Sequence, residues 1–332
     1  MDTSALEYEL PQELIAQRPA ERRDESRLLV YDRATGDIRH RRFSELPDQL
    51  APGELVVVNE TRVIPARLRL RRESGGEAEV LLLERVGPNG VWEGLARPSR
   101  RLRAGQRLGP VELLEPLGGG RWRLRLEGEP AGDTPLPPYI TEPLADPERY
   151  QTVYAREEGS AAAPTAGLHF TPELMGRLDV ERVTLHVGVD TFRPVESETL
   201  EEHEIHTEAY SVDPAAWERI EAADRVLAVG TTTTRVLETL ASNTVLQDGD
   251  AAAGAASGPS NTVLQGRTGL FITPGYEFKR VDSLLTNFHL PRSTLLALVM
   301  AFAGVEETRS LYELAIEERY RFYSFGDAML IR

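Results

Sequence analysis

The sequence contains no cysteine, only one lysine and no long apolar run. Without a thiol the chain cannot form a disulfide, a thiolate zinc site, an iron–sulfur cluster or a cysteine nucleophile, so four chemistries are excluded together. No stretch approaches the roughly 18 apolar residues that a membrane-spanning helix needs, and the acidic start lacks the basic and apolar regions of a signal peptide. These absences predict a cytoplasmic protein that does not enter a membrane.

Positive charge is scarce overall but unevenly distributed. The formal net charge is −15, which by itself opposes binding to nucleic acid because phosphates repel an acidic surface. Residues 1–130 contain 22 basic and 22 acidic residues, however, whereas residues 131–332 contain 16 and 31 and carry the whole excess. The preference for Arg over Lys is most simply a composition bias, but arginines also cluster at 62–72 and 96–107. Basic patches suited to phosphate can therefore exist in the first part of the chain.

The order of short apolar segments predicts two architectures within the 332 residues. Residues 26–46 alternate around an Ala-Thr-Gly-Asp turn, as in a hairpin, and the Val-rich stretch 53–64 predicts a buried strand. Between 66 and 137, five short candidate strands separated by Gly, Pro or Asn predict a small antiparallel barrel. After 150, strands alternate with helical stretches, which is typical of an α/β domain. The Ala-, Gly- and Ser-rich segment 242–266 contains one hexapeptide twice and predicts a mobile, functionally inert linker.

Two of the six histidines lie close together in the segment 201–208. His203, His206 and Glu208 have a spacing that could ligate a metal, although it is not the zincin pattern, and the strand-like residues that follow indicate a segment that leaves a helix. The same three side chains could instead form a non-catalytic hydrogen-bonding cluster or a site that binds or deprotonates an organic substrate. The residues alone leave all three interpretations open.

Several further polar residues lie at predicted junctions between strands and helices, where open α/β sheets present ligand-binding groups. Small residues before a helix let a ligand approach the backbone, and the free N–H groups there suit a carboxylate. Each junction is also compatible with an ordinary turn. None is a Walker A loop or a dinucleotide-binding fingerprint. The residues concerned are Thr165, Gly167 and His169, then His186 and Gly188, then Thr231 and Thr232, and finally Asn287 and His289.

Ten blocks, taken in order, resemble the S-adenosylmethionine:tRNA ribosyltransferase-isomerases of the queuosine pathway across nearly the whole chain. They are 16–30, 55–68 (LVVVNETRVIPARL), 136–140 (LPPYI), 150–155, 162–171 (AAPTAGLHFT), 183–195 (VTLHVGVDTFRPV), 203–208 (HEIHTE), 229–238 (VGTTTTRVLE), 270–304 and 320–331 (YRFYSFGDAMLI). The resemblance implies an α/β main domain, residues 1–64 and 150–332, into which a small antiparallel β-barrel, residues 65–149, is inserted. Asp190 stands where the family usually has a glycine, and 266–271 departs from the usual pattern.

The resemblance also implies a reaction. The ribosyl carbons of S-adenosylmethionine are transferred to the aminomethyl group of 7-aminomethyl-7-deazaguanine at the wobble position of a tRNA, and adenine and methionine are released. The sulfonium acidifies the C5′ protons, so a general base is needed, whereas no metal or redox cofactor is required. S-adenosylmethionine is thus a co-substrate, the tRNA is the partner, and a monomer is expected.

Site residues follow from the resemblance as expectations. The base is expected among His169, His186, His203, His206 and Glu208, with the histidines favoured because their ordinary pKa is near neutral. The S-adenosylmethionine pocket is expected at Thr165, Gly167, Gly188, Thr191, Thr231 and Thr232, and contacts to the substrate at Asn59, Thr61, Arg62, Asn287 and His289. Arg97, Arg100, Arg101 and Arg103 are expected to meet tRNA phosphates.

Two other classes of protein remain possible from the residues alone. A metal-dependent hydrolase would use His203, His206 and Glu208, and it predicts a bound transition metal. A non-catalytic RNA-binding protein would use the barrel and the arginine clusters, and it predicts tRNA binding without consumption of S-adenosylmethionine. Neither class accounts for the whole set of blocks.

Overall fold

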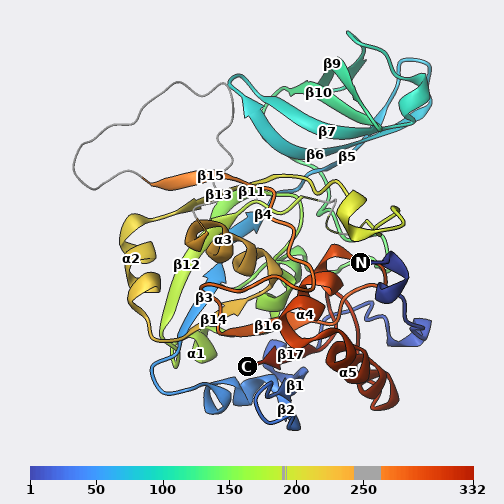
Figure 1. Ribbon diagram of the computed structural model, residues 1–332. Helices are drawn as coiled ribbons and strands as arrows, with labels where there is room; N and C mark the ends of the chain where they lie inside the picture. Colours follow the sequence, from blue (N-terminus) through green and yellow to red (C-terminus); the bar gives the residue numbers. More distant parts are fainter. Residues whose placement is uncertain (189–190, 192, 243–262) are drawn as a thin grey trace.

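The computed structural model describes residues 1–188, 191, 193–242 and 263–332 and has an α/β domain from which a smaller antiparallel barrel projects (Figure 1). This architecture confirms the predicted fold class. Most of the predicted linker at 242–266, and Asp190, lie outside the described residues. The exact domain boundaries at 64/65 and 149/150 stay a prediction.

Six antiparallel strands, rather than the five candidates of the sequence, form the nearly closed barrel. Residues 106–117 divide into two strands because Gly109 takes a positive φ of 56° and Pro110 follows it. Trp92, Trp122 and Leu124 are buried inside the barrel, so it has a core of its own. In spatial order the strands are β5 (Arg67–Arg71), β6 (Glu77–Gly87), β7 (Val91–Arg97), β10 (Arg121–Leu126), β9 (Val111–Gly118) and β8 (Arg107–Leu108).

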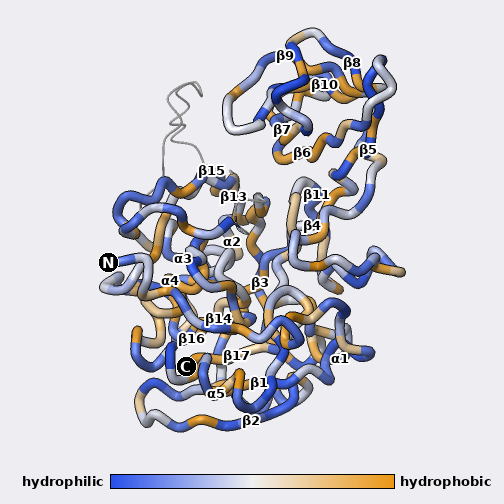
Figure 2. The backbone as a smooth tube through the Cα atoms, turned by 90° about the vertical axis from the view of Figure 1, so that its right-hand side faces the viewer, coloured by the Kyte–Doolittle hydropathy of each residue, from blue (hydrophilic) through white to orange (hydrophobic). Residues whose placement is uncertain are grey.

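The chain enters and leaves the barrel through two strands that lie side by side. β4 (Thr61–Val63) leads into the barrel and pairs in parallel with β11 (Glu157–Ser160), which returns to the main domain. Figure 2 shows the barrel carried above the main domain next to this pair. Because both connections run through the β4–β11 pair, the side of the barrel next to this pair faces the main domain.

A nine-stranded mixed sheet forms the centre of the main domain. Four neighbouring strands, β12, β3, β14 and β16, are parallel, so their carboxyl ends meet at one edge. The antiparallel pair β1–β2 is the predicted hairpin and confirms it. In spatial order the strands are β15 (Leu264–Thr268), β13 (Glu208–Val212), β12 (Val180–Leu185), β3 (Leu55–Asn59), β14 (Val226–Val229), β16 (Ser283–Asn287), β17 (Ala328–Ile331), β1 (Arg27–Tyr31) and β2 (Ile38–Arg42).

Both faces of this sheet are covered, which explains the apolar runs of its central strands β3 and β14. On β3, Leu55 and Val57 pack in the cluster that contains the long helices, whereas Val56 and Val58 pack in a cluster with short 3-10 segments. Among the described residues no helix is both long and apolar enough to cross a membrane. The α-helices are α1 (Pro172–Met175), α2 (Pro214–Ala222), α3 (Thr231–Ala241), α4 (Thr294–Ala303) and α5 (Val305–Glu317).

Candidate active site

A small cavity of about 40 Å³ lies where β14 and β16 end, at the carboxyl edge of the sheet. Its wall includes Thr165, Thr191, Thr231, Asn287 and His289, which come from four separate blocks of the sequence. Thr165 donates its hydroxyl to Oδ1 of Asn287 at 2.9 Å, and this bond ties the turn before α1 to the end of β16. The topology therefore brings together polar residues that are widely spaced along the chain.

The start of α3 forms one side of this cavity. Gly230 has a φ of 88°, a conformation that favours glycine, and it turns the chain sharply from β14 into the helix. The Thr233 and Thr234 hydroxyls bond back to the carbonyls of Val229 and Gly230, whereas Thr231 and Thr232 line the cavity. The first N–H groups of a helix have no partner within it, so this end suits a carboxylate.

A second cavity, of about 50 Å³, shares Thr191 and Leu295 with the first and extends towards the segment 203–208. Its polar wall contains the buried ion pair of Glu208 with Arg235. The other carboxylate oxygen of Glu208 accepts the Gly188 N–H at 2.9 Å. Glu208 thus anchors the backbone beyond β12 and is not an unpaired acid.

The segment 203–208 does not form a metal site in the part of the chain that the structure describes. The 3-10 helix Leu200–Glu202 ends before His203, as the sequence indicated, and no group of three or more His, Asp or Glu side chains there is arranged to hold a metal ion. His203 packs edge-on against Phe271, with ring centroids 5.6 Å apart. Burial lowers the pKa of His203, and the neighbouring His206 lowers it further.

A third cavity, of about 250 Å³, lies between the barrel and the main domain. It shares His206 and Glu208 with the second cavity, and the barrel contributes Glu84, Glu93 and Arg121, whereas His186 and Gly188 come from the end of β12. Three cavities thus follow one another from the start of α3 to the barrel. We call this series the interdomain cleft.

His186 has a defined tautomer in the cleft. Its Nδ1 lies 3.0 Å from Oγ1 of Thr61, and the Thr61 hydroxyl donates its single proton to the carbonyl of Glu157 at 3.3 Å. The arrangement that satisfies both contacts has Oγ1 accepting the proton of Nδ1, which leaves the lone pair on Nε2. Burial lowers the pKa of His186, although Glu84 and Glu157 oppose this shift, so the ring is neutral at pH 7.

The ring of His186 lies directly against a glycine. A Cβ placed on Gly159 would approach Cε1 of His186 to 2.9 Å and Nδ1 to 3.0 Å. Gly159 also has a φ of 143°, which side-chain-bearing residues rarely adopt. The return strand β11 therefore makes room for the imidazole.

Two other candidate histidines are buried and hydrogen-bonded to neighbouring side chains. His169 is 5% exposed, its Nδ1 bonds Ser26 at 2.8 Å, and its Nε2 accepts from Asn287 at 3.2 Å. His289 bonds Thr286 through Nε2 at 2.7 Å. Burial lowers the pKa of His169 and of His289 to about 3. Both ring nitrogens of His169 are therefore held by neighbouring side chains, and its role as the base stays a prediction.

Asn59 and Gly167 each have a structural role in the main domain. Asn59 is fully buried and bridges β3 to β12, since its amide donates to the Leu185 carbonyl and accepts the Leu185 N–H, both at 3.0 Å. It joins the two strands, and its contact with the substrate stays a prediction. A Cβ on Gly167 would meet the Tyr154 hydroxyl at 2.0 Å, so the neighbouring phenol already accounts for glycine there.

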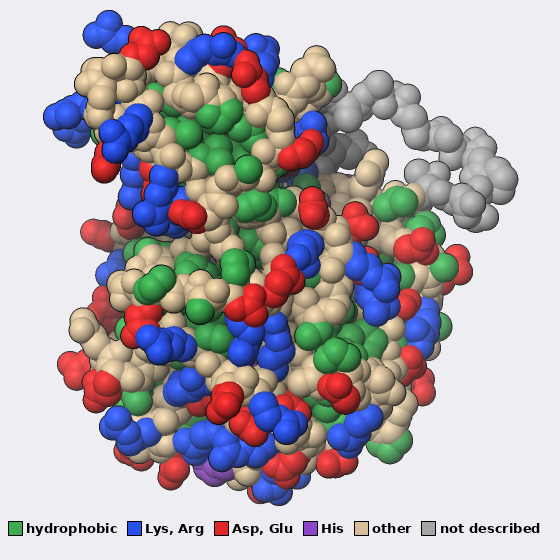
Figure 3. All heavy atoms as spheres, turned by 180° about the vertical axis from the view of Figure 1, so that it is seen from behind, with side chains coloured by type: hydrophobic (Ala, Val, Ile, Leu, Met, Phe, Trp, Pro, Cys, Tyr) green, Lys and Arg blue, Asp and Glu red, His purple; other side chains and the backbone are tan. Residues whose placement is uncertain are grey.

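The arginines expected to bind tRNA occupy different surroundings. Arg62 is paired with Glu148, whereas Arg100 and Arg101 are exposed in a 3-10 turn (Ser99–Arg101) and Arg103 is exposed just beyond it. From behind, basic side chains gather along one edge of the barrel and down towards the main domain (Figure 3). Arg97, at the end of β7, faces a separate and larger cavity.

Comparison with known proteins identifies the family. The family model described as queuosine biosynthesis protein matches residues 3–331. The chain belongs to this family. A Rubrobacter xylanophilus protein named S-adenosylmethionine:tRNA ribosyltransferase-isomerase is 53% identical over 347 residues, covering 100% of this chain and 98% of the relative. The relative of that name from Moorella thermoacetica is 52% identical over 358 residues, with both chains covered completely.

A solved structure supports the same assignment within the queuosine biosynthesis family. The crystal structure of S-adenosylmethionine tRNA ribosyltransferase from Thermotoga maritima superposes on this chain with a TM-score of 0.55. The two sequences are 38% identical, and the match covers 99% of this chain and 100% of the other. The resemblance seen in the ten blocks is therefore confirmed.

The sequence did not single out Arg235 or Gly159. Arg235 follows Thr231 by one helical turn and so lies on the same face of α3. That spacing was a usable signal for a residue that faces the cleft. Gly159 had no comparable signal, because its role depends on a ring contributed by β12, a strand that follows it in the chain.

Proposed function

We propose that this chain is an enzyme of queuosine biosynthesis that transfers and isomerises the ribosyl moiety of S-adenosylmethionine onto 7-aminomethyl-7-deazaguanine at the wobble position of a tRNA. The product is epoxyqueuosine-tRNA, and adenine and methionine leave. The observation that carries the proposal is a neutral histidine, His186, whose Nε2 lone pair has no partner among the described residues and which lines a cleft reaching the start of α3. Family membership supplies the substrates, because the relatives carry them in their names.

The chemistry begins with removal of a C5′ proton beside the sulfonium. His186 takes this proton through Nε2, since Nδ1 already carries one and the lowered pKa keeps the ring neutral. The ribose then opens and expels adenine, and the amine of the substrate base attacks the activated carbon skeleton. Closure of the epoxide displaces methionine. His203 lines the second cavity and His206 lines both the second and the third; both rank behind His186, whose Nδ1 is held by Thr61.

S-adenosylmethionine is proposed to lie along the inner cleft, near Thr165, Thr191, Thr231 and Thr232, with its carboxylate at the start of α3. The two inner cavities of about 40 and 50 Å³ are far smaller than ligand sites usually are. Binding therefore requires the cleft to open, and the outer cavity between barrel and main domain is where the tRNA base arrives. No metal is assigned a role, and we propose a cytoplasmic monomer.

The test is incubation of the protein with S-adenosylmethionine and tRNA that carries the 7-aminomethyl-7-deazaguanine base. Mass analysis of the wobble nucleoside should show the epoxide product, and free adenine should appear in equal amount. Binding of tRNA without adenine release would indicate an RNA-binding protein instead. Activity abolished by chelators and restored by a transition metal would favour the metallohydrolase alternative.

Variants in the same assay rank the candidate bases. His186→Ala should lower the rate by about a hundredfold to ten-thousandfold, the usual contribution of a general base. His203→Ala and His206→Ala should retain more activity than His186→Ala. If one of them loses more, the base assignment moves to that residue while the proposed reaction stands.

A further inference from the structure

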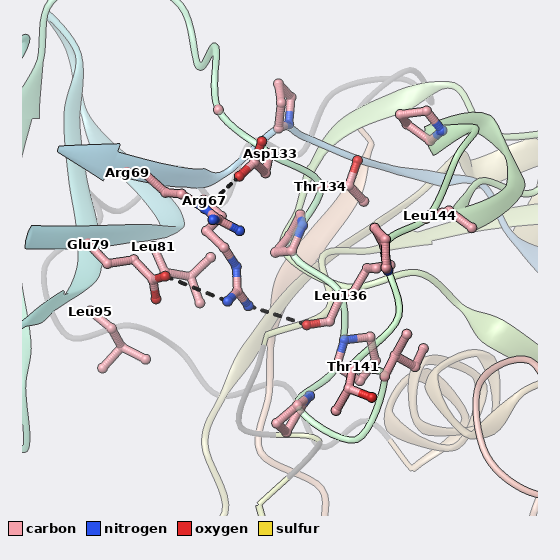
Figure 4. A pocket seen from close by; sticks show the side chains of 18 of the residues that line it. Arg67, Arg69, Glu79, Leu81, Leu95, Asp133, Thr134, Leu136, Thr141 and Leu144 are labelled. Carbon is pink, nitrogen blue, oxygen red and sulfur yellow. Dashed lines mark hydrogen bonds and ion pairs between the residues drawn. The ribbon is translucent and has the colours of Figure 1, made fainter. Parts of the chain in front are cut away.

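A cavity of about 810 Å³ lies outside the interdomain cleft, between the barrel and residues 132–147, which we call the strap. β5, β6 and β7 form its barrel side, and the proline-rich strap forms the other (Figure 4). Its apolar lining includes Leu81 and Leu95 from the barrel and Leu136 and Leu144 from the strap. A volume of this size is in the range of sites for whole organic ligands and far exceeds what a free anion needs.

Charge in this cavity is organised around arginines. Arg67 lies 3.7 Å from Glu79 and donates to the Leu136 carbonyl, and Arg69 lies 2.9 Å from Asp133. Figure 4 shows that the Arg67–Leu136 hydrogen bond and the Arg69–Asp133 pair join the barrel to the strap, whereas the Arg67–Glu79 pair lies within the barrel. The carboxylates offset the charge of these two guanidinium groups.

Arg97 is different, because no carboxylate among the described residues pairs with it. The third acid of the lining, Glu142, is paired with Arg18. Glu79 stands opposite Arg97 in the β6–β7 register but forms its ion pair with Arg67, so the Arg97 guanidinium is exposed at the cavity without an ion pair of its own in the described part of the chain. An exposed guanidinium beside an apolar wall is the combination that binds single-stranded nucleic acid, in which the phosphate meets the cation and the base meets the apolar surface.

The cavity and the catalytic cleft share a thin wall. Tyr139 of the strap lines the cavity at the end of β16, whereas its neighbours Pro138 and Ile140 line the 810 Å³ cavity. Thr191 likewise lines the inner part of the cleft, and Arg193 lines the 810 Å³ cavity. A strand of RNA with one nucleotide in the cleft can therefore place a nearby nucleotide on the other side of the strap.

We propose that this cavity seats a nucleotide of the anticodon loop next to the modified base, with its phosphate on Arg97. The inference rests on the proposed function for the identity of the RNA. The cavity then sets the register of the loop, because a phosphate contact positions a nucleic acid without reading its sequence. A base seated there is unstacked from its neighbours, which single-stranded loops allow.

The experiment compares Arg97→Glu with Arg85→Glu, a matched reversal of an exposed arginine on β6 that does not line the cavity. Arg97→Glu should raise KM for tRNA about tenfold or more, leave KM for S-adenosylmethionine unchanged, and reduce the salt dependence of tRNA affinity by about one phosphate contact. Arg85→Glu should change KM for tRNA by less than about twofold. Both arginines are exposed, so both variants are expected to fold.

A second measurement assigns the phosphate directly. An anticodon stem–loop with an uncharged methylphosphonate beside the modified base should bind the wild type about tenfold more weakly and lose no further affinity with Arg97→Glu, because the two changes remove one interaction. The inference would be overturned if Arg97→Glu and Arg85→Glu raised KM for tRNA equally. It would also be overturned if the losses of affinity from Arg97→Glu and from a methylphosphonate were additive at every position in the loop. If the wild type binds the stem–loop in this way but releases no adenine, the proposed function fails and the binding site stands.

Discussion

Replacing Thr61 by valine removes the acceptor that fixes the tautomer of His186 while it keeps the volume of the side chain. Thr61 is 1% exposed, so the substitution leaves packing almost unchanged. The Nδ1–H of His186 then loses its bond to Oγ1 at 3.0 Å. The imidazole proton then moves to Nε2, where it is better solvated at the cavity. With Nε2 protonated, this nitrogen cannot accept a proton from the substrate.

The size of the effect follows from the cost of a lost acceptor. An N–H left without a partner in a half-buried place costs about 1–3 kcal/mol. At about 1.4 kcal/mol for each factor of ten, the productive tautomer of His186 becomes roughly five to a hundred times rarer. We expect kcat of Thr61→Val to fall by about tenfold to a hundredfold, which is less than the loss on removing the base itself.

The assay is single-turnover adenine release between pH 5 and pH 9. The base acts in its unprotonated form, so the rate should rise with pH and level off, with the midpoint below the ordinary histidine pKa of 6.5 because burial lowers the pKa of His186. Thr61→Val should lower the plateau. Thr61→Ser, which keeps the hydroxyl, should restore the plateau to within about threefold of the wild type.

The reasoning is refuted if Thr61→Val keeps a wild-type plateau, or if serine is as poor as valine. Thr61 is a positioning residue in this account, since it acts on the substrate only through His186. Urea denaturation of both variants separates a catalytic effect from loss of fold, because a folding defect would lower the unfolding midpoint in parallel with the activity.

Three further predictions concern stability and the shape of the site. Glu208→Gln leaves the buried guanidinium partner of Glu208 unpaired, so the free energy of unfolding should fall by about 3 kcal/mol or more in urea titrations, and an unchanged midpoint would contradict the ion pair. Because burial holds the pKa of His169 and of His289 near 3, the unfolded state binds more protons below pH 6.5; stability should fall by about 2 kcal/mol between pH 6.5 and pH 5.5, and a flat profile would show that these rings are not buried neutral. Gly159→Ala should lower kcat at least tenfold as its Cβ displaces the ring of His186, and a variant that is folded and fully active would place that ring elsewhere.

The fold class could be predicted from the sequence because it depends on local periodicity. The change from short strands separated by turns to strands alternating with helices marks the barrel and the α/β domain, and each pattern reflects which side chains one element buries. The apolar run 55–58 predicts a strand that is buried on both sides, and in the structure both faces of the sheet are covered there. The splitting of 106–117 into β8 and β9 was missed because Gly109 and Pro110 could equally have been an irregularity within one strand.

The proposed ranking of the candidate bases rests on the tertiary structure. His169 and His186 stand in similar local sequence, beside glycines and threonines at the end of an element. His169 meets Ser26, 143 residues away, and is occupied at both nitrogens, whereas His186 meets Thr61, 125 residues away, and keeps its Nε2 lone pair. A pKa and a tautomer are set by burial and by hydrogen-bond partners. Those partners come from distant segments of the chain. The sequence therefore indicated which residues could act as the base, whereas the hydrogen bonds that distinguish these residues depend on the fold.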